Sequence, residues 1–372
     1  MFANFFRAPS YSGGAWSSFQ DDIIYTSDRI VSYEYTKRFT KPGSFALVLP
    51  FDKSLISAME INGTIYLDGD WLFIQSIAYD GKQLTISGKD CKGLLDLRIT
   101  SYHDQGIEGA EGYDVATGTT AACVKHYLDT NAISPTDNGR KLPLVWQNGA
   151  TGLNADSYMA RLEYLSDVVD KLCTSADIGY DVTGDMTGSG FKLRLIQGTD
   201  RSFGQDTHDR VIFSPAWRNV KALSFEHGVD DLYNTVYAVD SNEVAKVINR
   251  GQAVASGVAR RECTVSVGVS STAPETADYY DKYALEQLED NVETHSYSVE
   301  PSVTGYGTDY NLGDKVTVID SATGNRFDAV IVEATKSYSQ GARAVTVVLG
   351  HQKKKPLQRI VNDLIGGVAR RR

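Results

Sequence analysis

The chain has 372 residues, of which 42% are hydrophobic and 23% charged, and its formal net charge is −10. This length exceeds one comfortable hydrophobic core and the composition is that of a folded protein, so we expect two or three domains and exclude wholesale disorder. The acidic balance also argues against a surface that holds duplex DNA, because phosphate affinity comes from clustered Lys and Arg.

Neither a leader nor a membrane span is predicted. The N-terminal stretch MFANFFRAPS lacks a basic region and a long apolar core, and no run approaches the roughly 20 apolar residues that cross a bilayer. The cysteines form no C-x-x-C pair, which favours reduced, buried thiols in a chain that folds in a cytosol. They are Cys91, Cys123, Cys173 and Cys263.

Residues 1–100 are predicted to form an antiparallel β-domain. Asn62-Gly63 suits a two-residue hairpin, and Asp80-Gly81 begins a turn before a strand in which Leu84 and Ile86 alternate with polar residues. Gly88 ends that strand, and the leucines after it predict a short helix. Strands are predicted at Ile23 to Thr26, Ile30 to Phe39, Phe45 to Leu49, Thr64 to Leu67, Trp71 to Tyr79 and Gln83 to Ser87.

Residues 101–221 have the pattern of an α+β insertion. Helices are predicted at Thr119 to Thr130 and at Tyr158 to Ser175, the second with one apolar stripe. Two alternating strands follow, Tyr180 to Val182 and Phe191 to Ile196, joined by a Gly-rich hairpin.

Residues 222–350 return to strands, with a peripheral excursion expected at about 242–291. A helix is predicted there, with Thr272 as N-cap, Pro274 and Glu275 in the first turn, and an apolar side that ends at Leu288. The predicted strands are Leu223 to Phe225, Thr235 to Val239, Cys263 to Val267, Thr294 to Val299, Lys315 to Ile319, Asp328 to Ser337 and Ala344 to Leu349.

Two hairpins of the chain resemble each other. Residues 80–88 and 340–350 each read as turn, basic residue, alternating strand and glycine, and each follows a hairpin partner strand. Either a duplication or the general likeness of hairpins explains this, and the letters alone leave both open.

Residues 351–372 are predicted to form a basic amphipathic helix and tail. The segment after His351 holds seven basic residues and one acidic one, which makes it +6 and the rest of the chain −16. Its apolar stripe must find a partner: the chain's own sheet, a symmetry mate or another protein, or a membrane surface. The candidate partner-binding residues are Leu357, Ile360, Val361, Leu364, Ile365, Arg370, Arg371 and Arg372.

Four short motifs are spread along the chain. They are GSFALVLP at residues 43–50, GKDCKGLLDLR at 88–98, GTDRS at 198–202 and NLGD at 311–314. Together they resemble the tail-tip or baseplate hub proteins of long-tailed bacteriophages, over about 300 residues. The resemblance implies a mainly β fold with an α+β insertion: two tube-like antiparallel β-barrel or sandwich domains, each with a flanking helix, and a peripheral α+β domain.

The same resemblance implies a structural role without a cofactor. A homotrimer with two similar domains per chain would join a sixfold tail tube, or the ring of a distal tail protein, to threefold tip, fibre or receptor-binding proteins. Its channel, expected to be acidic, would pass tape-measure protein and DNA during genome delivery. We expect assembly in the host bacterial cytoplasm, localisation in the virion and no stable membrane insertion.

No enzymatic motif is found in the sequence, so an enzyme is not expected. G-x-S-x-G, H-E-x-x-H and the phosphate-loop pattern are all missing, and His103-Asp104 and Asp206 to Asp209 are better explained as solvated loops. A carbohydrate or cell-wall binding module is the first alternative, because the chain has 21 Tyr and four Trp. A cell-wall-degrading enzyme is the second, because paired carboxylates can meet in the fold without a sequence signature.

Overall fold

The computed structural model describes most of the chain and leaves several segments undescribed. The described residues are 2–12, 15–17, 23–100, 114–160, 162–184, 190–230, 232–240, 243–250, 254–266, 284, 288, 294–302, 305–320, 322 and 324–350. The molecule is mainly β, with large antiparallel sheets and few helices, which confirms the predicted fold class.

Four strands of the N-terminal part form what we call the first quartet. They are β5 (Ser32–Arg38), β6 (Ser44–Pro50), β8 (Asp70–Tyr79) and β9 (Gln83–Asp90), and they pair antiparallel in the spatial order β5-β6-β9-β8. Alternate residues of β6 and β9 face the core, as their period of two predicts.

Shorter elements surround the first quartet and fill its flank. The strands β7 (Thr64–Leu67), β1 (Ala3–Phe6) and β4 (Ile23–Ser27) continue the sheet beyond β8. The helix α1 (Lys53–Ala58) begins where the Asp52 carboxylate accepts hydrogen bonds from the amides of Ser54 and Leu55. The predicted short helix is the 3₁₀ helix η2 (Cys91–Leu97), and a small hairpin is formed by β2 (Tyr11–Ser12) and β3 (Ala15–Trp16).

The second quartet repeats the spatial order of the first. Its strands β16 (Val220–Gly228), β20 (Thr294–Pro301), β22 (Asn325–Ser339) and β23 (Ala342–Gly350) lie in the order β16-β20-β23-β22. Numbered along the chain, both quartets therefore read 1-2-4-3, with a hairpin joining strands 3 and 4. This shared order favours duplication as the origin of the two similar hairpins.

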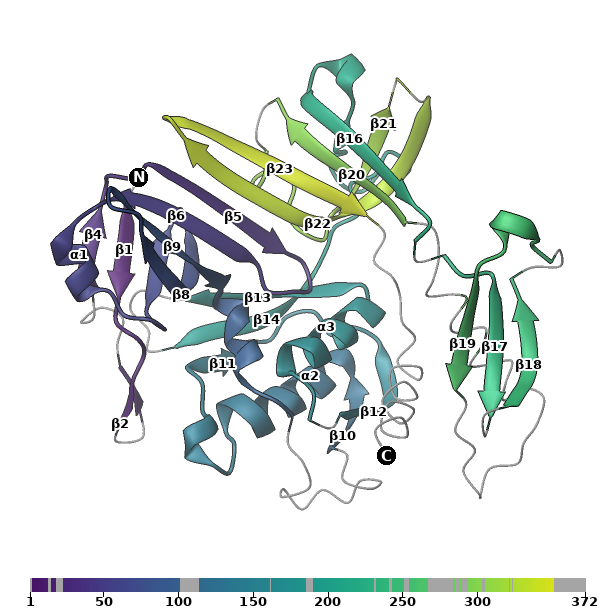
Figure 1. Ribbon diagram of the computed structural model, residues 1–372, viewed down its shortest axis with the longest axis horizontal. Helices are drawn as coiled ribbons and strands as arrows, with labels where there is room; N and C mark the ends of the chain where they lie inside the picture. Colours follow the sequence, from purple (N-terminus) through teal and green to yellow (C-terminus); the bar gives the residue numbers. More distant parts are fainter. Residues whose placement is uncertain are drawn as a thin grey trace.

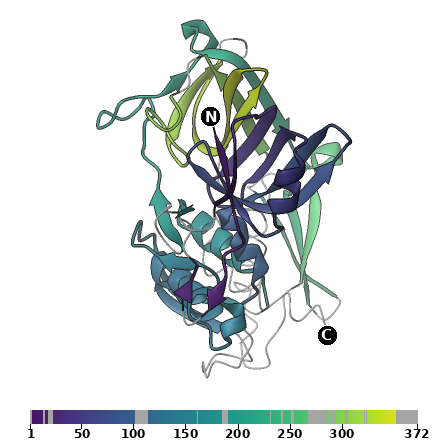
Figure 2. The same cartoon turned by 90° about the vertical axis from the view of Figure 1, so that its left-hand side faces the viewer.

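One long strand joins the two quartets into a single sheet. The first half of β22 pairs with β21 (Lys315–Asp320), and after a bulge between Ile331 and Glu333 the same edge pairs with β5. The result is a 13-stranded sheet in which the β22–β23 hairpin lies beside β5 (Figures 1 and 2). The short strand β15 (Ile212–Phe213) pairs with β21, and the 3₁₀ helix η6 (Pro215–Trp217) precedes β16.

The predicted α+β insertion lies below this sheet in Figure 1 and shares its core with the N-terminal part. Phe6, Trp71 and Leu95 belong to the same buried cluster as the two helices. The elements are β10 (Asp114–Thr119), α2 (Thr120–Leu128), the π-helical turn η4 (Asp129–Ile133), η5 (Asn138–Arg140), β11 (Leu144–Trp146), β12 (Asn154–Ala160), α3 (Leu165–Ser175), β13 (Ile178–Gly184) and β14 (Phe191–Gln197).

The prediction of a helix from Tyr158 was wrong at its start. Residues 154–160 form β12 because β10 offers them an antiparallel partner, with Tyr158 opposite Ala116. Leu162 then adopts a positive φ of 53°, which interrupts the chain before α3 begins at Leu165. The apolar stripe of the helix itself is confirmed, since Leu165, Val168, Val169 and Leu172 are buried.

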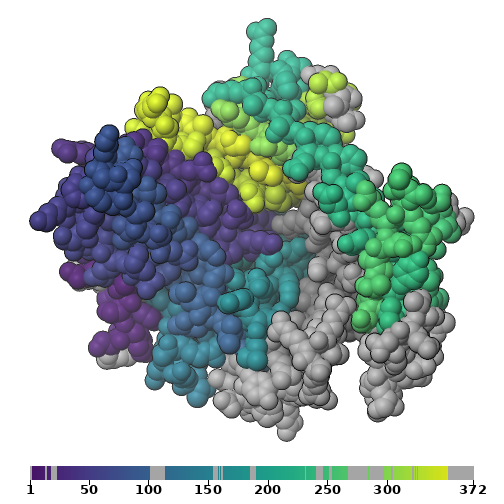
Figure 3. Space-filling model, in the orientation of Figure 1, coloured from purple at the N-terminus to yellow at the C-terminus, as the bar shows by residue number. Residues whose placement is uncertain are grey.

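A small three-stranded sheet stands apart from the other sheets. It contains β17 (Thr235–Asp240), β18 (Glu243–Asn249) and β19 (Glu262–Ser266), with the 3₁₀ turn η7 (Gly257–Ala259) before β19, and is green in Figures 1 and 3. Of the helix predicted from Thr272, the structure describes only Ala284 and Leu288, both buried. Among the described helices, none has the length and apolar character needed to cross a bilayer.

Candidate functional site

Side-chain contacts reinforce the joint between the two quartets, where β5 lies against β22. Along it, the hydroxyl oxygens of Thr36 and Thr335 are 2.8 Å apart, and Arg38 Nε donates to Glu333 Oε1 at 2.9 Å. Tyr33 and Tyr338 stack with ring centroids 6.0 Å apart. Hydrogen bonds, an ion pair and ring stacking therefore hold β5 against β22 in addition to the sheet ladder.

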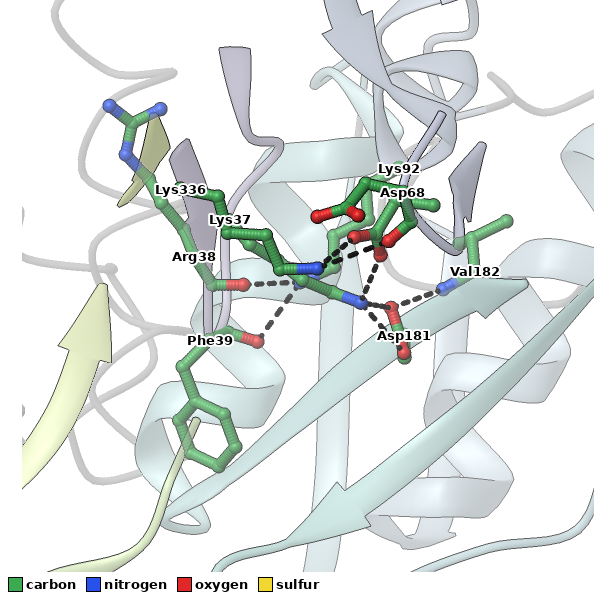
Figure 4. Close-up of polar contacts among 9 residues, drawn as sticks. Lys37, Arg38, Phe39, Asp68, Lys92, Asp181, Val182 and Lys336 are labelled. Carbon is green, nitrogen blue, oxygen red and sulfur yellow. Dashed lines mark hydrogen bonds and ion pairs between the residues drawn. The ribbon is translucent and has the colours of Figure 1, made fainter. Parts of the chain in front are cut away.

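A cluster of half-buried charges lies under this joint (Figure 4). Lys37 Nζ, on β5, is 3.3 Å from Asp70 Oδ1 on β8 and 3.1 Å from Asp181 Oδ1 on β13. Lys336 Nζ, on β22, is 2.7 Å from the other oxygen of Asp70. Two lysines and two carboxylates thus connect the first quartet, the insertion and the second quartet.

The pKa shifts of Lys37 and Asp181 favour the charged forms of these two residues. Burial opposes the charge of Lys37, but Asp181 and Asp70 outweigh it and raise the pKa of the lysine. Burial likewise disfavours ionised Asp181, but Lys37 and Lys92 lower its pKa below the ordinary value. Lys37 and Asp181 therefore stabilise each other's charged form, and removing one leaves the other uncompensated.

Lys92 and Asp90 lie deeper, in the second sequence motif. Lys92 is 1% exposed; its Nζ donates to the carbonyl oxygens of Arg38 and Phe39 and lies 4.7 Å from the centre of the Tyr180 ring. Burial lowers the pKa of Lys92, although Asp90 opposes the shift. Asp90 is 3% exposed, forms no ion pair with the described cations, and has its pKa raised by burial to about 6.

Asp90 predicts a measurable pH dependence of folding. Its carboxyl binds a proton more tightly in the folded chain than at its ordinary pKa of 3.8. The folded state therefore holds more protons between those two values, and stability falls as pH rises from about 4 to 6, by up to about 3 kcal/mol. Asp90→Asn should abolish this fall, as measured by urea unfolding at four pH values.

The difference between the wild-type and Asp90→Asn curves isolates this group, because histidines and other carboxylates contribute equally to both. The pKa of Asp181 is lowered in the folded chain, so this residue loses its contribution to stability only as the pH falls below its pKa in the unfolded chain. That range lies below the pH range considered for Asp90. Parallel curves for the two proteins between pH 4 and 6 would contradict the assignment.

The third and fourth sequence motifs meet in space although about 110 residues separate them. Asp314 accepts hydrogen bonds from the amide of Thr199 at 2.8 Å and the amide of Asn311 at 2.9 Å, and it pairs with Arg201 Nε at 3.0 Å. The amide of Lys315 donates to Thr199 O at 3.0 Å. We call this arrangement the Asp314 clamp; it ties the end of the insertion to β21.

Glycines allow the backbones at this clamp to touch. A Cβ on Gly198 would lie 1.8 Å from the carbonyl oxygen of Gly313, a distance that no side chain could accept. Gly313 itself has a φ of +87°, and its Cα faces the ring of Phe39, the residue that follows β5. The motif letters are therefore explained by close packing where separate parts of the chain meet.

The predicted partner-binding residues cannot be placed, because Leu357, Ile360, Val361, Leu364, Ile365 and Arg370 to Arg372 lie outside the described residues, as does His103-Asp104. The four cysteines are unpaired, with Cys91, Cys123 and Cys173 buried and Cys263 partly so. Asp206 lies in an exposed loop and pairs with Arg210. Within the described residues, no group of three or more His, Cys, Asp or Glu side chains could hold a metal ion.

The charged cluster was missed by sequence analysis. Lys37 lies in a strand whose polar residues would ordinarily face water, so the sequence did not indicate a buried charge there. Lys92 could have been suspected of burial, because it falls among the buried leucines of the second motif. The sequence does not indicate which carboxylate lies near either lysine.

The chain is similar to known phage tail proteins over almost its whole length. The family model described as Siphovirus ReqiPepy6 Gp37-like protein matches residues 22–351. No protein in the curated set matches the sequence significantly.

Solved structures share the fold at low sequence identity. The 43 kDa tail protein of prophage MuSo2 from Shewanella oneidensis is 14% identical with a TM-score of 0.54, covering 96% of this chain and 99% of its own. A tail protein from Neisseria meningitidis MC58 is 16% identical with a TM-score of 0.55, covering 95% and 99%. In the lidded Francisella PdpA–VgrG complex, the matching chain is 10% identical with a TM-score of 0.50, covering 94% of this chain and 52% of that one.

Proposed function

The chain belongs to the Siphovirus ReqiPepy6 Gp37-like family of phage tail proteins, and on this premise we propose that it is the homotrimeric hub of a tail tip or baseplate. In this role it joins a sixfold tail tube, or a distal tail protein ring, to threefold tip or fibre proteins. Three chains with two similar quartets each offer six similar β units around one axis.

The observation that carries this proposal is how the quartets are joined. Strand 3 of the second quartet, β22, pairs with strand 1 of the first, β5. This contact is head-to-tail, so it leaves strand 1 of the second quartet, β16, at one end of the sheet, and the outer edge of strand 3 of the first quartet, β8, on the far side of that quartet, where β7 covers only part of it. Repeating the same contact between chains would close a ring of six quartets.

The outer edge of β8 has room for this contact. Only Asp70 to Phe73 pair with β7, and Ile74 bonds to the Asn62-Gly63 turn. Within the described residues, Ser76–Tyr79 pair with β9 on one side and have no ladder partner on the other. The same segment of β22 would be uncovered in this way if β5 were removed. An edge of this length is an aggregation hazard unless a neighbour covers it, and a second copy of the chain supplies a cover.

The internal joint also suggests the register. Each quartet has one bulge in its third strand, at Gln75 of β8 and at Val332 of β22, so Ala78 corresponds to Thr335, which lies opposite Thr36. The ladders match Thr36 with Glu226, because Thr36 leads through Ser44 to Lys89, and Glu226 leads through Ser296 to Gly350, at the equivalent place in the second quartet. Ala78 of β8 would then face Glu226 of the next chain.

The negative charge of the chain would suit a ring through which DNA passes. A channel for tape-measure protein and DNA needs a lining to which a polyanion does not stick, and the chain without its basic tail carries −16. We propose an acidic lumen, with assembly of the hub in the host bacterial cytoplasm before it joins the virion.

The basic tail is proposed as a contact to a neighbouring chain or tail protein. It follows Gly350 of β23, which pairs with β20 in the second quartet. Its apolar stripe at Leu357, Ile360, Val361, Leu364 and Ile365 would pack on the partner, while Arg370, Arg371 and Arg372 meet its acidic surface. A chain ending at Lys355 tests this alongside the full chain in the mass measurement below.

The purified chain is expected to have a mass of about 122 kDa by light scattering, three times 40.7 kDa, and to form rings with an axial opening in electron micrographs. The truncated chain should form fewer trimers or lose a tail partner. A monomer at all concentrations up to those of an assembling tail would contradict the hub.

Cysteine crosslinking tests the register separately. In a Cys263→Ser background, Glu226→Cys combined with Ala78→Cys should form disulfides between chains on oxidation, giving covalent trimers. Glu226→Cys alone should not exceed a dimer. Trimers without crosslinks would preserve the hub and remove the proposed edge contact.

A further inference from the structure

A cleft of about 540 Å³ opens beside the start of β16, outside the proposed ring contact. Residues of the 201–213 segment, η6, the end of β20 and the 305–310 loop form it. Its rim carries the indole of Trp217, which is 57% exposed. The lining includes Arg201, Asp209, Arg210, Trp217 and Asp309.

The walls of this cleft are braced from behind. Gln205 Oε1 accepts from the amides of Thr207 and His208, each at 2.8 Å, and its Nε2 donates to His208 O at 2.9 Å. Arg201 is held by the Asp314 clamp. A cleft of this volume with preformed walls is typical of a small-ligand site.

The Trp217 side chain is presented by unusual backbone. Pro215 starts the single turn of η6, and Arg218 directly after Trp217 adopts a left-handed conformation with φ 59°. A non-glycine residue there is disfavoured, and such strain collects at functional sites. The turn keeps a large apolar ring in water instead of folding it into the core.

The lining chemistry separates three classes of occupant. Asp209 and Asp309 line the cleft together with Arg201 and Arg210, and the two arginines are already paired with Asp314 and Asp206. The lining therefore has no surplus of positive charge to attract a polyanion such as DNA or a charged wall polymer. The two aspartates also suit the centre of a protein interface poorly, because Asp is depleted there. An exposed aromatic face among planar donors and acceptors suits a hydroxyl-rich ring.

We infer that this cleft binds a short, uncharged oligosaccharide, with Trp217 stacking on the apolar face of one sugar ring. Asp209 and Asp309 accept hydrogen bonds from sugar hydroxyls, and the guanidinium groups of Arg201 and Arg210 donate to them. This is a binding activity in addition to the structural role, and it does not depend on trimer formation.

The test uses the full chain and a panel of neutral oligosaccharides that includes the β-1,4-linked N-acetylglucosamine tetramer and maltotetraose. Saturation-transfer NMR detects binding, and calorimetry measures affinity. Trp217→Ala should weaken the best ligand at least tenfold, and Asp309→Asn should weaken it less. Trp16→Ala is the matched control, because Trp16 is partly exposed but packs against Tyr11, with the two rings tilted by 53°, away from the cleft.

Several outcomes would overturn the inference. They are no binding of any neutral oligosaccharide at 20 mM, equal affinity of the wild type and Trp217→Ala, or binding of anionic glycans alone. Loss of trimers in Trp217→Ala without loss of glycan binding would assign the cleft to a neighbouring chain. Unchanged urea midpoints for both tryptophan variants show that the fold is intact.

Discussion

Replacing Asp314 by alanine is expected to destabilise the chain by about 3 to 5 kcal/mol, because it breaks a buried ion pair and removes the acceptor for two amides. The side chain of Asp314 is 5% exposed and that of its partner Arg201 is 21% exposed. The amides of Thr199 and Asn311 would lose their acceptor in a space that alanine does not fill. The insertion would then separate more easily from β21.

Urea unfolding followed by circular dichroism measures this effect. Asp309→Ala is the control, since it removes an exposed aspartate five residues away and should change stability by less than about 0.5 kcal/mol. Adding Arg201→Met to Asp314→Ala should cost less than the sum of the two single changes, because no unpaired cation then remains. A loss below about 1 kcal/mol for Asp314→Ala would show that the clamp is not a stabilising contact.

Replacing Lys37 by methionine is expected to cost a similar amount, about 3 to 5 kcal/mol. Methionine keeps the length of the side chain but leaves Asp181 without its closest cation and Asp70 with Lys336 alone. Both carboxylates are about 15% exposed, so water compensates only part of the lost attraction. The quartets and the insertion should come apart at lower urea concentration.

A second change distinguishes charge from packing. Lys37→Met with Asp181→Asn should recover part of the lost stability, because the uncompensated carboxylate is then neutral. Lys221→Met is the matched control: it lies in a strand and forms an ion pair with Glu300 at 3.3 Å, but its side chain is 53% exposed. That change should stay within about 0.5 kcal/mol. Equal losses for Lys37→Met and Lys221→Met would refute the special role of the cluster.

The four sequence motifs and the cluster illustrate different limits of prediction. GTDRS and NLGD were singled out as family motifs, and the structure adds that the two motifs contact each other through Asp314. The strand at Gln83 to Ser87 was confirmed because its period of two is a local property, but the prediction that Gly88 ends it was wrong: β9 continues to Asp90 because β6 and β8 pair with it there. Tyr158 was assigned to a helix because its neighbours have helical spacing, whereas its strand partner Ala116 is 42 residues away.

The sequence by itself determined the elements whose pattern is local: alternating strands, the apolar stripe of α3, the turns and the mainly β class with its insertion. Only the tertiary structure decided how the quartets join, since a strand edge looks the same in sequence whether β5, β21 or another chain covers it. It also decided which charges meet. Pairs such as Lys37 with Asp181 are 144 residues apart, and their attraction depends on distance and burial, which no local pattern encodes.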